Sequence, residues 1–218
     1  MTRHSATLIS VNVTAIVHED KWAGKVGKTG IDKRPVLGRV KLIDNAVTGD
    51  VVADVKGHGG YDQAVYAYAR EDTQWWESEL GIVIANGRFG ENLTTQGVDV
   101  TGAVIGERWS IGSAVLEVSQ PRIPCRVFAG FWDRPTLIKD FTKAGRPGAY
   151  LRIIQAGDIG AGDEIIVSNR PSHGVTISDL FAARTGERSR MSDISLVPQL
   201  SDSYREWVAS VIKSNREN

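Results

Sequence analysis

The sequence predicts a mainly β protein, a barrel or sandwich with few helices, followed by a small helical appendage. Over roughly the first 170 residues, short β-branched or aromatic segments alternate with glycine-rich turns, a pattern typical of β-barrels and sandwiches. The chain contains 23 glycines but only 7 prolines, which agrees with many turns. After Arg170 the spacing of apolar residues becomes helical. We therefore expect a β-barrel domain over residues 1–170 and a three-helix domain over residues 171–218.

Short segments with alternating or β-branched residues predict the strands. They cover residues 7–17, 36–43, 51–55, 64–69, 104–111, 114–119, 150–155 and 164–167. Glycine-rich segments at residues 22–35, 56–62 and 156–163 are expected to be loops, and residues 86–99 a loop with a short strand. Gly112 and Ser113 separate two strands and indicate a hairpin.

Two helices are expected inside the β domain, at residues 71–80 and 134–144. Gly81 and Gly145 follow them, and glycine commonly ends a helix. Pro135 stands in the first turn of the second helix, where proline is tolerated.

The C-terminal domain is expected to hold three short helices, at residues 176–184, 192–199 and 201–213. Thr176 and Asp179 have the spacing of a capping box, and Ser201 is placed to cap the last helix. Three short amphipathic helices bury little surface by themselves, so we expect them to dock on the barrel or on a partner.

Composition narrows the function classes. The 26 Lys and Arg residues balance the 26 Asp and Glu residues, which gives no general affinity for nucleic acid polymers or membranes. The single cysteine excludes an intramolecular disulfide and an iron–sulfur cluster held by several cysteines. No signal peptide or membrane span is evident, so we expect a cytoplasmic protein.

The single cysteine, Cys125, lies in the segment QPRIPCRVF. Pro121 and Pro124 fix their own φ and push the preceding residues to extended conformations, so Cys125 should lie in a stiff extended segment rather than a helix. Arg122 and Arg126 favour its thiolate, the form that attacks or binds metal. Taken alone, a cysteine of this kind is more commonly a small buried hydrophobe.

Two glycine-rich motifs have the residues to contact a ligand. In KGHGGYD, three glycines expose backbone N–H groups around His58, and Asp62 follows closely. In GRFGENL, Arg88 suits contact with a phosphate or carboxylate, and Asn92 follows it. The structural alternatives are a surface hairpin and a capped turn with a surface ion pair, and neither motif decides between them by itself.

The segment GKVGKT resembles the end of a phosphate-binding loop. That motif needs a glycine where Trp22 stands, and Gly30 and Pro35 prevent a long helix from following, so we exclude a nucleotide triphosphatase. A basic loop remains, and it contains Lys25, Lys28, Lys33 and Arg34.

Protein side chains alone do not complete a metal site in this sequence. The cysteine and four scattered histidines lack zinc-type spacing. If Cys125 binds a metal, that metal should bring most of its own ligands, and a soft thiolate suits a soft or dithiolene-ligated metal. Since the sequence has no strand–GxGxxG–helix unit for a dinucleotide, a redox role needs an external electron donor.

Four segments occur in the order VKGHGGYDQAVYAYARED, GRFGENLTTQGV, ERWSIGSAVLEVSQPRIPC and GAYLRIIQAGDIGAGDEI. Together they resemble the MOSC-domain family, named after the C-terminal part of molybdenum cofactor sulfurase, over about residues 35–167. The following VTISDLF…SLVPQLSDSYREWV is similar to the three-helix appendage of one bacterial branch, which includes a reductase of N-hydroxylaminopurines. The resemblance implies a MOSC-type β-barrel with a few helices and this appendage.

The resemblance also implies a molybdenum-pyranopterin cofactor, the molybdenum cofactor, with Cys125 as the protein ligand of the metal. The implied reaction reduces small N-hydroxylated compounds such as hydroxylaminopurines, amidoximes and hydroxylamines. His58 and Asp62 are candidates for proton delivery or substrate contact beside Cys125. We assign cofactor binding to Lys33, Arg34, Gly57, Gly59, Gly60, Arg88, Asn92 and Arg122.

The expected partners are the substrate and an electron donor. Some relatives carry a ferredoxin-like extension that is not found here, so the resemblance implies an external flavoprotein reductase. The oligomeric state stays open, with a homodimer among the alternatives.

Two other functions also stay open. A cofactor carrier or sulfur-transfer module would use Cys125 to carry a persulfide or to hand on the cofactor, although the sequence shows no desulfurase domain to supply sulfur. A degenerate barrel that binds a partner through its helices would leave Cys125 as packing. The joint presence of QPRIPC, KGHGG and GRFGENL argues against such a scaffold.

Overall fold

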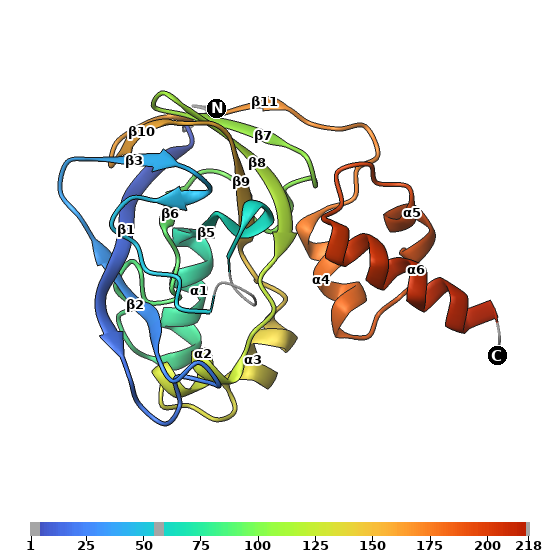
Figure 1. Ribbon diagram of the computed structural model, residues 1–218, viewed down its shortest axis with the longest axis horizontal. Coiled ribbons are helices and arrows are strands. Elements are labelled where there is room, and N and C mark those ends of the chain that lie inside the picture. Colours follow the sequence, from blue (N-terminus) through green and yellow to red (C-terminus); the bar gives the residue numbers. More distant parts are fainter. Residues whose placement is uncertain (1–4, 55–58, 217–218) are drawn as a thin grey trace.

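The computed structural model describes residues 5–54 and 59–216, and a large curved sheet dominates it (Figure 1). In these residues the sheet has eight strands in the order β11-β7-β8-β9-β5-β6-β1-β2, and a smaller sheet has the order β10-β3-β4. Neighbouring strands run antiparallel, except for the parallel pair β5 and β6. The strands are β1 (Thr7–His18), β2 (Thr29–Pro35), β3 (Arg39–Ile43), β4 (Ala46–Val47), β5 (Val65–Ala69), β6 (Leu93–Gln96), β7 (Arg108–Ile111), β8 (Ala114–Pro121), β9 (Ala149–Gln155), β10 (Gly157–Gly160) and β11 (Ile165–Asn169).

The helices form two groups in Figure 1, one at an end of the sheet and one beside β8. The first group is α1 (Arg70–Leu80), α2 (Arg126–Phe131) and α3 (Leu137–Ala144), and the second is α4 (Ile177–Thr185), α5 (Met191–Ser195) and α6 (Asp202–Arg216). A short 3-10 helix, η1 (Tyr61–Gln63), precedes β5. No helix in the described part of the chain is both long and apolar enough to cross a membrane.

The prediction of a mainly β fold with a few helices is confirmed, although the sheet does not close into a complete barrel in the described residues. Among the described residues the strand ladder ends at β2 on one side and at β11 on the other. The sheet curls so far that the start of β1 meets the segment before β11, where Leu8 N–H donates to the Asp163 carbonyl at 2.9 Å. β1 pairs with β2 only from Asn12 onward, so the segment before β11 meets the start of β1 and not β2. The two edge strands, β2 and β11, therefore do not pair with each other.

Three expected boundaries differ from the structure because hydrogen bonding outside the local sequence decides them. The predicted loop at residues 22–35 contains β2, which pairs along β1, and the predicted loop at 156–163 contains β10, which pairs with β3. The strand predicted at 51–55 is absent from residues 51–54, since Val51 N–H donates to the Thr14 hydroxyl at 3.1 Å instead of joining a ladder. Val55 lies outside the described residues.

The predicted helices are present with shifted ends. α1 and α3 both stop at glycines in the left-handed region, Gly81 at φ 66° and Gly145 at φ 65°. The capping box at the start of α4 is confirmed, because the Thr176 hydroxyl accepts from Asp179 N–H while the Asp179 carboxylate accepts from Thr176 N–H.

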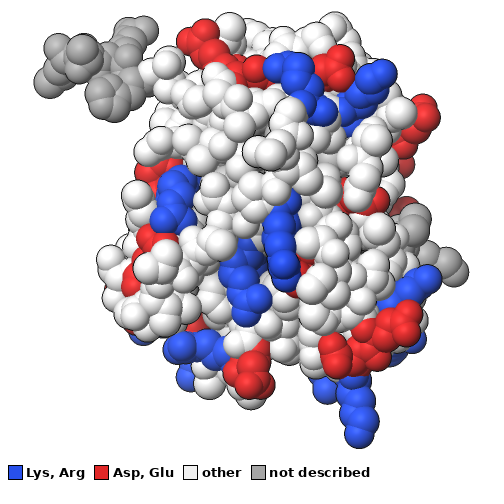
Figure 2. All heavy atoms as spheres, turned by 90° about the vertical axis from the view of Figure 1, so that its left-hand side faces the viewer, with Lys and Arg blue, Asp and Glu red and all other residues white. Residues whose placement is uncertain are grey.

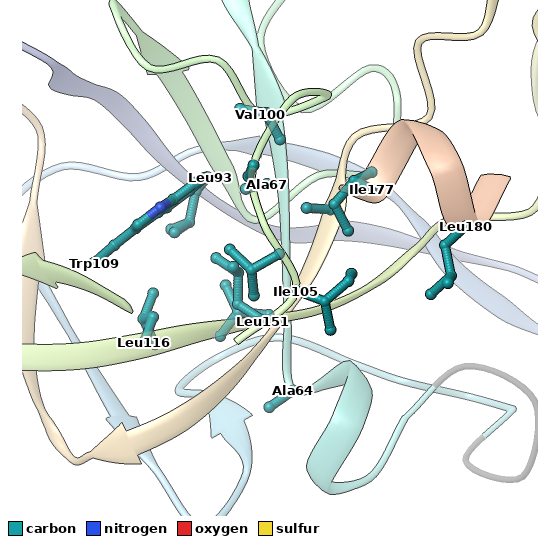
Figure 3. Close-up of a cluster of buried hydrophobic side chains, with 14 of the residues drawn as sticks. Ala64, Ala67, Leu93, Val100, Ile105, Trp109, Leu116, Leu151, Ile177 and Leu180 are labelled. Atoms are coloured by element: carbon teal, nitrogen blue, oxygen red, sulfur yellow. The ribbon is translucent and has the colours of Figure 1, made fainter. Parts of the chain in front are cut away.

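The C-terminal helices pack on the same hydrophobic core as the sheet. Ile177 and Leu180 of α4 lie beside Ile105 and Leu151 of the sheet region (Figure 3), and all four are fully buried. The apolar faces of the helices are therefore covered by this chain itself. The division into domains at residues 1–170 and 171–218 stays a prediction.

A second, aromatic cluster lies where α1, α2 and α3 meet the end of the sheet. Tyr68 stacks on Phe89 with ring centroids 4.3 Å apart, and Phe128 and Phe141 pack edge-on at 5.2 Å. Tyr66 and Arg122 border this cluster. Rigid aromatic packing therefore supports the segment that carries Cys125.

Candidate functional site

A cavity of about 290 Å³ is lined by β2, the loop after Gly49, and the segment that joins β8 to α2. Four of the predicted catalytic or cofactor-binding residues line it, namely Lys33, Asn92, Arg122 and Cys125. They come from β2, the residue before β6 and the segment between β8 and α2, which are far apart in the chain. The fold therefore brings these four residues to one cavity.

Cys125 is half-buried and lies at the junction of an extended segment and a helix. Its own backbone is extended, with φ −127° and ψ 171°, as the prolines predicted. The expectation that Cys125 lies in an extended segment rather than in a helix is confirmed; it is the N-cap residue of α2, which begins at the next residue, and its carbonyl accepts from Ala129 N–H at 3.2 Å. Cys125 is therefore held on both sides, by the prolines before it and the helix after it.

Arg122 lines the same cavity as Cys125, with only 6% of its surface exposed. Its guanidinium carbon lies 4.9 Å from the ring centroids of both Tyr66 and Phe128, and its Nη1 donates to the Phe89 carbonyl. Burial works against the charged form, but Tyr66, Tyr150 and Cys125 outweigh it and raise the pKa of Arg122 above its usual value. The cavity wall therefore contains a fixed positive charge that interacts with Cys125.

The Nε of Arg122 is buried and has no hydrogen-bond partner in the described protein. Gly90 leaves room for the Arg122 guanidinium, because a Cβ at residue 90 would lie 3.2 Å from Arg122 Nη1 and 3.0 Å from Ile31 Cγ1. A buried N–H donor is costly when it remains unpaired. A ligand group bound against this part of the cavity wall can therefore accept a hydrogen bond from Arg122 Nε.

Lys33 and Asp50 form an ion pair in another part of the cavity wall. The Asp50 carboxylate also accepts from the Thr14 hydroxyl at 2.8 Å and from the Asn92 amide at 2.9 Å. Burial lowers the pKa of Lys33, while Asp50 opposes that shift. Burial alone would raise the pKa of Asp50, but Lys33, Asn92 and Thr14 together lower it.

Two tyrosines form an aromatic side of the cavity. Tyr66 and Tyr150 face each other across the β5–β9 pair, with ring centroids 5.1 Å apart. Gln63 lines the cavity nearby, and its buried Oε1 has no partner in the described protein. This part of the wall thus offers flat apolar surface and one hydrogen-bond acceptor.

The mouth of the cavity is basic, with Lys25, Lys28 and Arg126 all exposed along it. On the face shown in Figure 2, acidic and basic side chains are interspersed. A local basic rim on a mixed surface favours a small anionic ligand.

The cavity lining does not include three other charged candidates. Arg34 pairs with Asp32 and its side chain is 59% exposed. Arg88 lies over the Phe131 ring at 4.0 Å, and it donates to the Phe131 carbonyl. Asp62 accepts from Arg152 Nε at 2.7 Å. In each case nearby protein groups already engage the side chain.

The remaining candidates belong to the KGHGGYD motif. Gly59 and Gly60 do not line the cavity, and Gly60, at φ 82°, precedes η1. Gly57 and His58 lie outside the described residues.

Asp50, Gln63, Tyr66 and Tyr150 line the cavity but were not singled out as site residues in the sequence. The tyrosines sit in strand patterns that fit a core equally well, and only the β5–β9 register brings them together. Asp50 follows Gly49 and resembles an ordinary turn residue. Its pairing with Lys33 depends on the tertiary fold, and no local signal predicts it.

Cys125 supplies a thiol to this cavity, and the other polar side chains that line it offer nitrogen or oxygen atoms. Within residues 5–54 and 59–216, no three His, Cys, Asp or Glu side chains cluster so that they could hold a metal ion. The arrangement suits a ligand that is anionic, partly flat and able to take one thiolate.

Comparison with known proteins finds similarity over most of the chain. The model of the MOSC domain matches residues 54–166. YflK of Bacillus subtilis (strain 168) is 32% identical over 195 residues, which cover 88% of this chain and 87% of YflK. A protein named reductase from Gibberella moniliformis (strain M3125 / FGSC 7600) is 34% identical over 147 residues, or 66% of this chain but only 26% of that longer protein. The crystal structure of YiiM from Geobacillus stearothermophilus matches with a TM-score of 0.78 at 30% identity, covering 94% of this chain and 98% of that one.

Proposed function

The chain belongs to the MOSC domain family, and on this basis we propose that it is a molybdenum-cofactor-dependent reductase of N-hydroxylated compounds. The substrate class comprises hydroxylaminopurines, amidoximes and hydroxylamines. Electrons come from a separate flavoprotein reductase, and the reaction takes place in the cytoplasm. The reductase-named relative supports the reaction type. The observation that carries the proposal is the cavity that joins Cys125 to the buried Arg122.

The cavity fits an anionic metal–organic cofactor. Its buried Arg122 Nε lacks a hydrogen-bond partner in the described protein, and a cofactor oxygen or sulfur acceptor would satisfy it. Lys25, Lys28 and Arg126 at the mouth supply charge for a phosphate. Cys125 supplies one soft ligand, which is enough for a metal that brings the others with it.

Each of these residues has a role in the proposal. When bound, the molybdenum cofactor supplies two-electron redox chemistry. Cys125 Sγ would ligate the metal, and the Arg122 charge favours the thiolate over the thiol. Tyr66 and Tyr150 provide a flat wall against which planar rings can stack.

Three of the earlier candidates have no role in this proposal. Arg34, Arg88 and Asp62 do not line the cavity and are engaged by other protein groups. We therefore assign the mouth of the cavity, rather than Arg34 or Arg88, to the anionic end of the cofactor.

The proposal is tested by producing the protein with a full cofactor supply and comparing it with Cys125→Ala and Cys125→Ser. Elemental analysis should find about one molybdenum atom per chain in the unchanged protein, because a single thiolate site binds one metal. Reduction of a hydroxylaminopurine is then followed with reduced viologen as the chemical electron donor. Both variants should lose the metal and the turnover.

Ser168→Ala is a suitable control, since Ser168 is exposed on β11 and does not line the cavity. It should keep both molybdenum and activity. Full reductase activity in metal-free protein would refute the proposal. Molybdenum-loaded protein that reduces no N-hydroxylated compound with any donor would instead indicate a carrier of the cofactor.

A further inference from the structure

Lys33 and Asp50 are the most deeply buried ion pair in the cavity wall. Their side chains are only 9% and 6% exposed, and both line the cavity. Thr14 and Asn92 hold the carboxylate from other sides, with hydrogen bonds of 2.8 and 2.9 Å. The Lys33 ammonium is therefore fixed in position by a carboxylate that is itself fixed.

This ion pair is poorly suited to holding the anionic end of a cofactor. Asp50 already neutralises Lys33, and a phosphate brought to Lys33 would also approach the Asp50 carboxylate. The exposed cations Lys25, Lys28 and Arg126 offer a phosphate more favourable contacts at the mouth. The Lys33 region of the wall, neutral as a pair, instead fits an uncharged polar group such as a hydroxylamino group.

We propose that Lys33, positioned by Asp50, is a catalytic residue that gives a proton to the departing hydroxyl oxygen of a substrate bound in this cavity. The inference rests on the proposed function and names one proton source for it. In the overall reaction R–NHOH takes up two electrons from the reduced flavoprotein and two protons, its N–O bond breaks, and R–NH2 and water form. Lys33 Nζ supplies the proton that ends on the departing oxygen, and solvent supplies the other.

The surroundings of Lys33 favour release of that proton. Burial lowers its pKa from the usual value of 10.5, and the Arg122 charge acts in the same direction. Asp50 and Glu91 are the charged groups that oppose this shift. After the transfer, the neutral amine regains a proton from water through the mouth of the cavity, and the Asp50 carboxylate stays unprotonated.

The test compares Lys33→Met and Lys33→Arg with a matched surface variant, Lys41→Met. Lys41 is exposed on β3 and does not line the cavity. Arginine keeps the positive charge beside Asp50 but cannot give up its proton near neutral pH. Both Lys33 variants should keep the molybdenum content of the unchanged protein while kcat falls about 100-fold, as expected for loss of a general acid.

The KM should change much less than kcat. In the unchanged protein kcat/KM should fall at alkaline pH as Lys33 loses its proton, and this fall should be absent in Lys33→Arg. A paired variant, Lys33→Met with Asp50→Asn, removes both charges and leaves no buried carboxylate unpaired. The paired variant should therefore fold even if Lys33→Met alone does not, and it should show the same loss of kcat. Added alkylammonium ions should partly restore the rate of Lys33→Ala.

A readout that does not depend on turnover is the NMR titration of 13C-labelled lysine, with the Lys33 signal assigned by its absence in Lys33→Arg. We expect the pKa of Lys33 to lie below the usual lysine value of 10.5. A pKa at or above 10.5 would overturn the inference.

Other outcomes separate this inference from the proposed function. If the molybdenum-loaded unchanged protein reduces no substrate, the proposed function fails. If it is active and Lys33→Arg is equally active, only the role of Lys33 fails. Loss of molybdenum in Lys33→Met, with full activity in Lys33→Arg, would show that Lys33 holds the anionic cofactor and would also overturn the inference.

Discussion

Gly90 shows how a residue without a side chain shapes the candidate site. Its φ of 75° lies in the left-handed region, and a Cβ there would lie 3.0 Å from Ile31 Cγ1 and 3.2 Å from Arg122 Nη1. Left-handed backbone is costly for other residues, and the crowding would press on the buried guanidinium. Gly90 is therefore a condition for the observed position of Arg122.

We predict that Gly90→Ala lowers the free energy of unfolding by about 2–4 kcal/mol, from backbone strain together with overpacking. Urea unfolding at neutral pH measures this loss. Molybdenum content should also fall, because Arg122 would have to shift.

Gly145→Ala is the matched control for this prediction. Gly145 has a similar φ of 65°, but a Cβ there would meet nothing within 4 Å. Its cost should therefore be about 1 kcal/mol of backbone strain alone. Equal losses in the two variants would contradict a packing role for Gly90.

At the residue scale, the sequence is informative where a residue type is rare or its neighbours restrict it. Cys125 stands out as the single cysteine, and its prolines predict its extended backbone, which the structure confirms. Tyr66 and Tyr150 have no such signal, since tyrosines in strands commonly pack in a core. Their common role as a cavity wall arises only from strand register.

The N-terminus of α4 is the part of the structure that the local sequence predicts most directly. Burial tends to raise the pKa of Asp179, but hydrogen bonds from Thr176 and Arg190 outweigh it and hold the pKa below the usual 3.8. A carboxylate with a lowered pKa stabilises the fold above its unfolded pKa, and this contribution is lost as pH falls through the folded value.

We therefore predict that Asp179→Asn destabilises the protein by about 1 kcal/mol at pH 7, typical for loss of a helix cap. The difference from the unchanged protein should shrink as the pH falls below about 4, where the native carboxylate begins to take up its proton. Urea unfolding at a series of pH values measures it.

Asp193→Asn is the control, because Asp193 also binds Arg190 but its side chain is 57% exposed. Exposed ion pairs contribute little, so this change should be nearly neutral. An acid dependence that is the same in Asp179→Asn and in the unchanged protein would refute the argument.

Elements that depend on distant partners were less predictable. β2 contains a glycine, three charged residues and a terminal proline, which resemble a loop, yet the long β1 strand provides it with a ladder. Residues 51–54 have the better strand composition, but the Thr14 hydroxyl binds Val51 N–H at 3.1 Å. Amino-acid composition indicates only a preference for strand. Whether a segment forms a strand depends on the backbone hydrogen-bond partners that the fold provides.

At the scale of the whole molecule, the predicted strand-rich body and C-terminal helices are confirmed, but the closure of the sheet is not. Closure depends on the register and bulges of β1, which shift its pairing with β6 and with β2. Such irregularities arise from the packing of the complete sheet and leave little trace in local patterns. The shared core of α4 and the sheet is likewise a tertiary property.

Arg152 joins three parts of the molecule through one guanidinium group. It donates to Asp62 of η1 at 2.7 Å, to Glu117 of β8 at 2.9 Å and to the Gln199 carbonyl at 2.8 Å. Its side chain is only 7% exposed, and that of Glu117 is 9% exposed. The C-terminal helical segment, the sheet and the turn before the cavity-lining Gln63 are therefore connected at one buried point.

We predict that Arg152→Met lowers the free energy of unfolding by about 3–5 kcal/mol, because it breaks the buried ion pair with Glu117 together with the contacts to Asp62 and the Gln199 carbonyl, and leaves Glu117 only its half-exposed partner Arg108. Arg108→Met is the matched control: Arg108 also pairs with Glu117, at 3.0 Å, but is 44% exposed, so its loss should cost at most about 1 kcal/mol. Urea unfolding compares the two variants.

Because Asp62 directly precedes Gln63, Arg152→Met should also lower molybdenum content, and Arg108→Met should leave it unchanged. Equal stability losses in the two variants would show that the buried connection does not hold these parts together.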